Sequence, residues 1–181
     1  CKKNVIEPKV LIAGCGTGNQ IFQALRYKNA QITAIDLSRT SLAYAQRKIN
    51  EHKVKNVKLI MMDLLDVGSL QTEFDIIECG GVLHHMQDPQ QGLKALLGVL
   101  SKNGFLKLAL YSELARQDII KARKYIEENK LSPSKKNIIN FRRDILNNKL
   151  TDLNSLKYTS DFYSISMCRD LCFHIKEHRF N

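Results

Sequence analysis

The sequence lacks the marks of a membrane-spanning, secreted or repetitive protein. No apolar run approaches the ~18 residues that a membrane-spanning helix needs. Lys2, Lys3 and Asn4 lead directly into a strand-like segment, without the pattern of a signal peptide. We find no internal repeat and no low-complexity segment. The first residue is Cys1 rather than Met, so we expect an excised fragment.

The sequence also lacks a disulfide framework and a convincing metal site. Cys168, Cys172, His174 and His178 have suggestive spacing, but on one helix the two pairs would point about 200° apart. We therefore predict no metal. The cysteines are odd in number and irregularly spaced, which predicts free thiols in a reducing cytoplasm: Cys1, Cys15, Cys79, Cys168 and Cys172.

A basic tail is absent as well. The net charge of +10 is divided evenly between residues 1–112 and 113–181. The Lys and Arg residues lack interleaved aromatics or a known binding motif, which favours a solvated basic surface. Binding to nucleic acid or an acidic partner is the alternative that this charge leaves open.

What is present is the alternation of a parallel α/β fold. With 181 residues, the chain is long enough for one domain with a full core. We expect helices over 18–28, over 38–52 after Ser38 as the N-cap, and from Pro89 after Asp88. The expected strands are 9–13, 30–36, 57–62, 74–79 and 105–111. This order predicts a Rossmann-like, doubly wound parallel sheet with strand order 3-2-1-4-5 and helices on both faces.

After residue 112 the pattern becomes helical. Helices are expected over 113–129, from Pro133 onward and over 161–178, with Ile175 facing inward and a polar linker over 150–160. We therefore divide the chain into a core, 1–112, and a helical extension of the same domain, 113–181.

Three glycines follow the first predicted strand: Gly14, Gly16 and Gly18. A strand, a glycine turn and a helix form the geometry of a nucleotide-binding βαβ unit, because glycine allows backbone angles that a Cβ forbids. Backbone N–H groups at the helix start can then approach a ligand closely. By itself this glycine spacing is a weak signal.

Acidic residues end the next two strands and strengthen the signal. Asp36 can accept hydrogen bonds from both ribose hydroxyls of a nucleoside, with a helix cap as the alternative. Asp63 can accept one from an adenine amino group, with a cap or turn as the alternative. Leu37 and Leu64 could enclose the base. A nicotinamide dehydrogenase is disfavoured, because position 19 is Asn and no second dinucleotide half follows.

Four spaced motifs carry a family resemblance: Val10–Gly18, Ala34–Ser38, Met62–Leu64 and the segment from Phe74 to Pro89 through His84-His85. Over about residues 5–112 the chain resembles class I S-adenosylmethionine-dependent methyltransferases. The later segments 110–118 and 161–180 resemble bacterial methyltransferase domains often found beside tetratricopeptide repeats. The family sheet has seven strands with a terminal antiparallel hairpin, and we predict no such hairpin before Asn181.

The resemblance implies positions for the cofactor. Asp36 and Leu37 would hold the ribose side, and Asp63 and Leu64 the adenine. Cys79 and Gly80 would add backbone contacts beside the sulfonium. The turn and the helix start would wrap the methionine part: Gly14, Cys15, Gly16, Thr17, Gly18 and Gln20.

Residues after the fourth and fifth strands are candidates for catalysis and substrate binding. His84 or His85 could act as a base, and we expect only one of them to face the pocket, since adjacent residues on a helical turn point apart. Packing or loop capping is the alternative for both. Tyr111 and Arg116 could bind the acceptor, and Glu113 could assist catalysis. Their alternative is helix capping and surface pairing.

The acceptor itself is not specified. No Asn/Asp-Pro-Pro-Tyr/Phe motif follows the fourth strand, and no cysteine–proline nucleophile is found. A small molecule or a protein is therefore the favoured acceptor. A non-catalytic binding module and an RNA methyltransferase are the alternatives.

Overall fold

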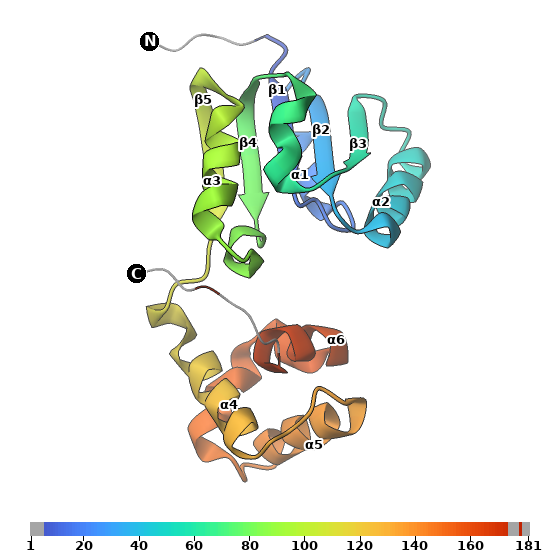
Figure 1. Ribbon diagram of the computed structural model, residues 1–181. Helices are drawn as coiled ribbons and strands as arrows, with labels where there is room; N and C mark the ends of the chain where they lie inside the picture. The colour runs from blue at the N-terminus through green and yellow to red at the C-terminus, as the bar shows by residue number, and fades with distance from the viewer. Residues whose placement is uncertain (1–5, 174–177, 179–181) are drawn as a thin grey trace. The chain divides into compact units, whose positions relative to one another are not determined.

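The computed structural model describes residues 6–173 and residue 178. The chain forms two compact units, Cys1–Leu110 and Tyr111–Asn181. The first unit contains the sheet, and the second is helical (Figure 1). Within the described residues, no helix is both long enough and apolar enough to cross a membrane.

The sheet has five parallel strands in the order β3-β2-β1-β4-β5. The predicted α/β fold and its strand order are confirmed. Because all strands are parallel, their carboxyl ends meet at one edge of the sheet. The strand bounds are β1 Lys9–Ala13, β2 Gln31–Asp36, β3 Val57–Met61, β4 Phe74–Gly80 and β5 Leu100–Ala109.

Helices cover both faces of this sheet, as Figure 1 shows. α1 (Asn19–Ala24) and α2 (Arg39–Glu51) pack against one core cluster, which takes Val10 and Ile12 from β1. The 3-10 helix η1 (Leu64–Leu70) and α3 (Pro89–Gly98) enclose the other, which takes Leu11 and Ala13. β1 is therefore buried on both sides, as expected of a central parallel strand.

Both predicted N-caps are confirmed. The Ser38 hydroxyl accepts a hydrogen bond from the Ser41 N–H, and the Asp88 carboxylate accepts from the Gln90 and Gln91 N–H groups. The helix predicted over 18–28 is too long, since α1 ends at Ala24.

The early end of α1 has a physical cause in the residues that follow. Arg26 and Tyr27 turn toward Glu78 on β4, whose Oε1 accepts hydrogen bonds from Arg26 Nη2 at 2.9 Å and the Tyr27 hydroxyl at 2.6 Å. Glu78 is buried, so its carboxylate needs these partners.

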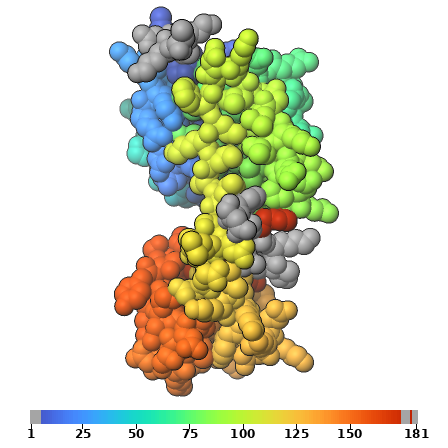
Figure 2. Space-filling model, turned by 90° about the vertical axis from the view of Figure 1, so that its left-hand side faces the viewer, coloured from blue at the N-terminus to red at the C-terminus, as the bar shows by residue number. Residues whose placement is uncertain are grey.

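β5 begins five residues before the predicted start of its strand. Phe74 pairs with Leu100 and Ile76 with Phe105, so residues 101–104 form an irregularity inside the strand. Asn103-Gly104, a dipeptide typical of turns, lies in this bulge. Within residues 6–173 no antiparallel hairpin follows β5, and its outer edge faces the viewer in Figure 2 (yellow-green).

The second unit has its own apolar core, which includes Phe141, Phe162 and Phe173. The predicted linker over 150–160 is wrong. Leu153 and Leu156 are spaced by three residues, so a 3-10 helix can bury both. The helical elements of the second unit are η3 Leu114–Arg116, α4 Gln117–Glu128, α5 Lys135–Leu146, η4 Thr151–Tyr158, η5 Ser160–Tyr163, α6 Ile165–Cys168 and the π-helical turn η6 Arg169–Phe173.

The predicted continuous helix over 161–178 is also wrong. Ser164 has an extended backbone, which separates η5 from α6. Ile175, which we expected to face inward, lies outside the described residues.

Candidate functional site

The turn between β1 and α1 depends on its glycines. Gly14, Gly16 and Gly18 have φ angles of 74°, 51° and 98°, a region that residues with a Cβ rarely adopt. The N–H groups of Gly14 and Cys15 both donate to the Ile35 carbonyl. A Cβ on Gly14 would lie 2.1 Å from Val82 Cγ2, so only glycine allows this close approach.

Asp36, at the end of β2, is hydrogen-bonded to this turn. Its Oδ2 accepts from the Gly16 N–H at 2.8 Å, and its Oδ1 accepts from the Ser38 N–H at 2.7 Å. Ser38, rather than Asp36, supplies the side-chain cap of α2. Asp36 therefore joins the glycine turn to the segment between β2 and α2.

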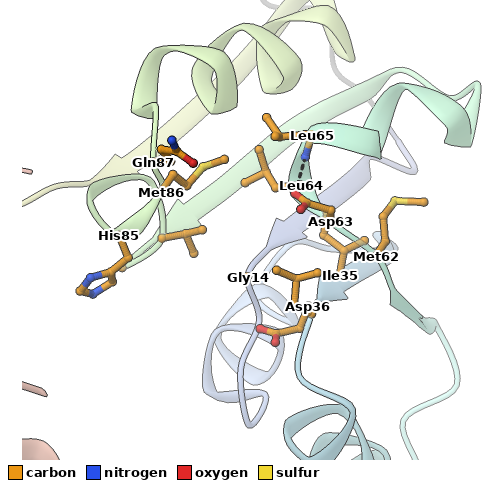
Figure 3. Close-up of a pocket in the computed structure, with 13 residues that line it drawn as sticks. Gly14, Ile35, Asp36, Met62, Asp63, Leu64, Leu65, His85, Met86 and Gln87 are labelled. Atoms are coloured by element: carbon orange, nitrogen blue, oxygen red, sulfur yellow. Dashed lines mark hydrogen bonds between the residues drawn. The ribbon is translucent and has the colours of Figure 1, made fainter. Parts of the chain in front are cut away.

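A cavity of about 480 Å³ lies at the carboxyl ends of the strands (Figure 3). Its volume is within the range of about 300–1,000 Å³ that is usual for small-molecule sites. The lining is mostly apolar, with Asp36, Asp63, His85 and Gln87 as its polar side chains. The full lining is Gly14, Ile35, Asp36, Leu37, Met62, Asp63, Leu64, Leu65, Gly81, Val82, His85, Met86 and Gln87.

Asp63 lies on the side of the cavity next to β3. Its Oδ1 accepts a hydrogen bond from the Leu65 N–H at 2.9 Å and so caps η1, as the dashed line in Figure 3 shows. Leu37 and Leu64 both line the cavity, but Leu37 is 67% exposed and Leu64 only 6%. The structure thus brings Asp36, Leu37, Asp63 and Leu64 together.

The two histidines after β4 have different environments. His85 is exposed and lines the cavity, whereas His84 is fully buried and lies outside the lining. Their rings meet edge to face, with centroids 4.2 Å apart. Of the two candidate bases, His85 is the one at the cavity.

Other residues that we predicted for the cofactor do not line the cavity. Cys15 and Cys79 are buried, and Thr17 is exposed. The Gln20 side-chain amide donates to the Gly80 carbonyl at 3.3 Å. Gln20 Oε1 is buried and accepts no hydrogen bond within the described part of the chain.

Three predicted residues belong to the second unit. The Arg116 guanidinium lies 3.6 Å from the centroid of the Tyr111 ring, which is a cation–π contact. Glu113 immediately precedes η3. Their roles toward an acceptor stay predictions.

Sequence reasoning missed seven residues of the lining: Ile35, Met62, Leu65, Gly81, Val82, Met86 and Gln87. Met62 and Leu65 flank the predicted pair Asp63-Leu64 and could have been found from that position. Met86 and Gln87 lie in the short link between η2 (Leu83–His85) and the cap Asp88. No residue type there indicates a ligand, so sequence alone offered no signal.

Within residues 6–173 and 178, no group of three His, Cys, Asp or Glu side chains is placed to hold a metal ion. His174, one member of the cluster considered above, lies outside the described residues.

The buried thiols of Cys15 and Cys79 should be unreactive in the folded protein. Burial, followed by the negative charge of Asp36, raises the pKa of Cys15 to about 12, and burial raises the pKa of Cys79 to about 11. Both thiols are thus protonated at pH 8, where about a thousandth of Cys79 would be thiolate. We expect iodoacetamide to leave both unmodified at pH 8 in the native protein and to modify both in guanidinium, as read by peptide mass spectrometry.

The same pKa shifts determine how the stability of the fold changes with pH. Because the folded state raises both values above the ordinary 9, their stabilising contribution is complete below pH 9 and is lost as pH rises toward 11 and 12. Rapid modification of either thiol by iodoacetamide in the native protein at pH 8 would contradict the raised pKa values of Cys15 and Cys79.

Comparisons with known proteins agree with this geometry. An uncharacterized protein of Synechococcus sp. is 42% identical over 114 residues, or 62% of this chain and 27% of that protein. A tRNA U34 carboxymethyltransferase of Campylobacter fetus is 33% identical over 102 residues, or 56% of this chain and 36% of that protein. The chain thus spans well under half the length of these relatives.

A solved structure extends the likeness to nearly the whole chain. PKMT2 from Rickettsia typhi in complex with AdoHcy superimposes with a TM-score of 0.77 at 23% identity, over 95% of this chain and 36% of that one. At this identity the likeness concerns the fold alone. A family model described as "Methyltransferase domain" matches residues 7–160, which is most of the sequence. The chain therefore belongs to the methyltransferase domain family.

Proposed function

We propose that the first unit binds S-adenosylmethionine and that the protein transfers its methyl group to an acceptor. One observation carries this proposal. The cavity at the carboxyl ends of the strands is bordered by Gly14, Asp36 and Asp63, with the Asp36 carboxylate already fixed by the glycine turn. Ligands of open parallel sheets bind at this edge, beside the first strand.

The residues present fit this cofactor. Each Asp36 oxygen accepts one backbone N–H and can accept a ribose hydroxyl as well. Asp63 Oδ2 takes no part in the cap of η1 and is available for an adenine amino group. The buried Gln20 Oε1, which has no partner in the described part, suits a donor on the methionine part. The remaining proposed contacts are Leu37, Leu64, the backbone of residues 14–18, Cys79 and Gly80.

The chemistry asks little of the protein. S-adenosylmethionine supplies a methyl group on a positively charged sulfur, so the residues must chiefly align the acceptor with it. We propose His85, exposed at the cavity, as the base for an acceptor that carries a proton. His84, buried against it, would position the His85 ring. Tyr111 and Arg116 remain proposed contacts with the acceptor, and Glu113 remains a proposed aid to catalysis.

We retain a small molecule or a protein as the favoured acceptor. RNA is the second candidate, because the Campylobacter relative is by name an enzyme acting on tRNA. We also infer a cytoplasmic setting, which the free thiols of Cys15, Cys79, Cys168 and Cys172 support. A neighbouring tetratricopeptide-repeat array is proposed from the resemblance of the later segments alone.

Calorimetry with the intact chain tests the proposal. We expect S-adenosylmethionine and S-adenosylhomocysteine to bind with one-to-one stoichiometry, and incubation with fractionated cell lysate to convert the first into the second. Binding without conversion in any fraction would favour the non-catalytic module. Absence of binding by either ligand would refute the proposed site.

A further inference from the structure

A buried glycine of α3 lies against the turn that carries the two histidines. Gly92 is in the first part of α3, where its N–H donates to the Asp88 carbonyl at 3.5 Å. A Cβ at this position would lie 2.5 Å from Met86 Sδ and 2.8 Å from Leu83 Cδ2. Side chains do not approach each other so closely. Leu83 and Met86 therefore occupy space that any larger residue at position 92 would take from them.

The two residues that pack on Gly92 flank His84 and His85. Leu83 begins η2 and is 2% exposed, and Met86 follows the end of η2 with its N–H bonded to the Leu83 carbonyl. Leu83 belongs to the core cluster enclosed by η1 and α3, and Met86 packs against that cluster. The contact with Gly92 therefore involves both ends of the turn.

Met86 also lines the proposed cofactor cavity, so it lies between that cavity and Gly92. In Figure 3 its thioether points toward Leu64, which lines the cavity as well. Because protein interiors are close-packed, a methyl group added at position 92 has to displace its neighbours. Leu83 is enclosed by the core, whereas the end of the flexible Met86 side chain has the cavity beside it. Met86 is thus the residue that we expect to move, and the cavity is where it moves.

The backbone at Gly92 does not itself require glycine. The residue lies within a helix, and its φ is outside the positive range that Gly14 and Gly81 adopt. Alanine is a better helix former than glycine, so the local structure alone would favour alanine at this position. The close contact with Leu83 and Met86 is the feature that alanine would change.

We propose that Gly92 is a positioning residue for the cofactor cavity, because it leaves the room that keeps the Met86 side chain out of the space the cofactor occupies. This inference rests on the proposed function, since it takes the cavity to be the cofactor site. Gly92 does not line the cavity and acts through Met86. A helix that contributes no residue to the described lining thereby takes part in shaping the site.

Calorimetric titration of Gly92→Ala with S-adenosylhomocysteine tests the proposal. We expect binding at least tenfold weaker than in the wild type, because one methylene group too many in an apolar pocket changes recognition by about 10–200-fold. The matched control is Gly98→Ala in the same helix. Gly98 is exposed, and a Cβ there would meet no atom within 4 Å, so the affinity should stay unchanged.

Removing the Met86 side chain tests whether it transmits the effect. In a Met86→Ala background, the further change Gly92→Ala should weaken binding less than twofold, because the vacated space lets Leu83 give way. The proposal is overturned if Gly92→Ala keeps wild-type affinity, if Gly98→Ala loses as much, or if the loss is as large in the Met86→Ala background.

A measurement without ligand separates this inference from the proposed function. In protein labelled with ¹³C-methyl methionine, the Met86 resonance, assigned through Met86→Ala, should move in Gly92→Ala and not in Gly98→Ala. An unmoved resonance in Gly92→Ala would overturn the displacement of Met86. A wild-type chain that does not bind S-adenosylhomocysteine would instead refute the proposed function, and the resonance would still decide whether Gly92 sets the position of Met86.

Discussion

The Asp36→Ala variant is expected to bind S-adenosylhomocysteine at least a hundredfold more weakly than the wild type. The substitution removes a carboxylate at the edge of the cavity that is proposed to accept two ribose hydroxyls. Hydrogen bonds to a charged group contribute about 1.5–3 kcal/mol each, so the loss of two corresponds to about 3–6 kcal/mol. It also removes the acceptor for the Gly16 and Ser38 N–H groups, which loosens the turn. Calorimetric titration measures the effect.

The chain offers a matched control in Asp88. This aspartate also accepts two backbone N–H groups, but as the N-cap of α3 and outside the cavity lining. Asp88→Ala should lower the free energy of unfolding by about 1 kcal/mol and leave the affinity unchanged. If Asp36→Ala keeps wild-type affinity, Asp36 does not hold the ribose. If the two variants lose affinity equally, the effect is one of stability.

Gly14→Ala should lower the free energy of unfolding by about 2–5 kcal/mol. An alanine at a φ of 74° is strained, at a cost of about 1–2 kcal/mol. Its Cβ would lie 2.1 Å from Val82 Cγ2, and such overpacking typically costs a further 1–3 kcal/mol. Chemical denaturation followed by circular dichroism gives the value.

Two companion variants separate strain from overlap. Gly16 also has a positive φ, but a Cβ there would meet no atom within 4 Å, so Gly16→Ala reports strain alone. The Val82→Ala change should restore stability to Gly14→Ala but not to Gly16→Ala, because it removes the colliding methyl group. Equal stability of the two single glycine variants would show that the turn shifts to avoid Val82.

The sequence supported the sheet and one side of the site because both depend on local patterns. Five apolar runs with glycine, Ser38 or Asp88 between them are enough to predict a parallel sheet with helices between its strands, and the acids at 36 and 63 follow from where strands end. The bulge at Asn103-Gly104 was missed because the Asn-Gly dipeptide is found both in turns before strands and in bulges within them, so the sequence does not distinguish the two. The early end of α1 was missed because it depends on Glu78, some 50 residues away.

Whether a side chain is buried or lines the cavity was harder to predict than the loop in which it lies. The pattern around His84-His85 does not say which ring enters the core, since both lie on one short turn. Only packing buries His84 and leaves His85 at the cavity. Gln87 was missed for a similar reason. It is a polar loop residue of a common type, and only the path of the chain brings it to the cavity.

The hydrogen bond from the Gly16 N–H to Asp36 bears on the thermodynamics of binding. A turn already held in place by its own side chain does not have to become ordered when a ligand arrives. Little conformational entropy is then lost, so the heat-capacity change on binding should reflect the buried ligand surface rather than coupled folding. The site is in this sense pre-organised. Asp36, which is proposed to recognise the ribose, is also the residue that holds the glycine turn in place.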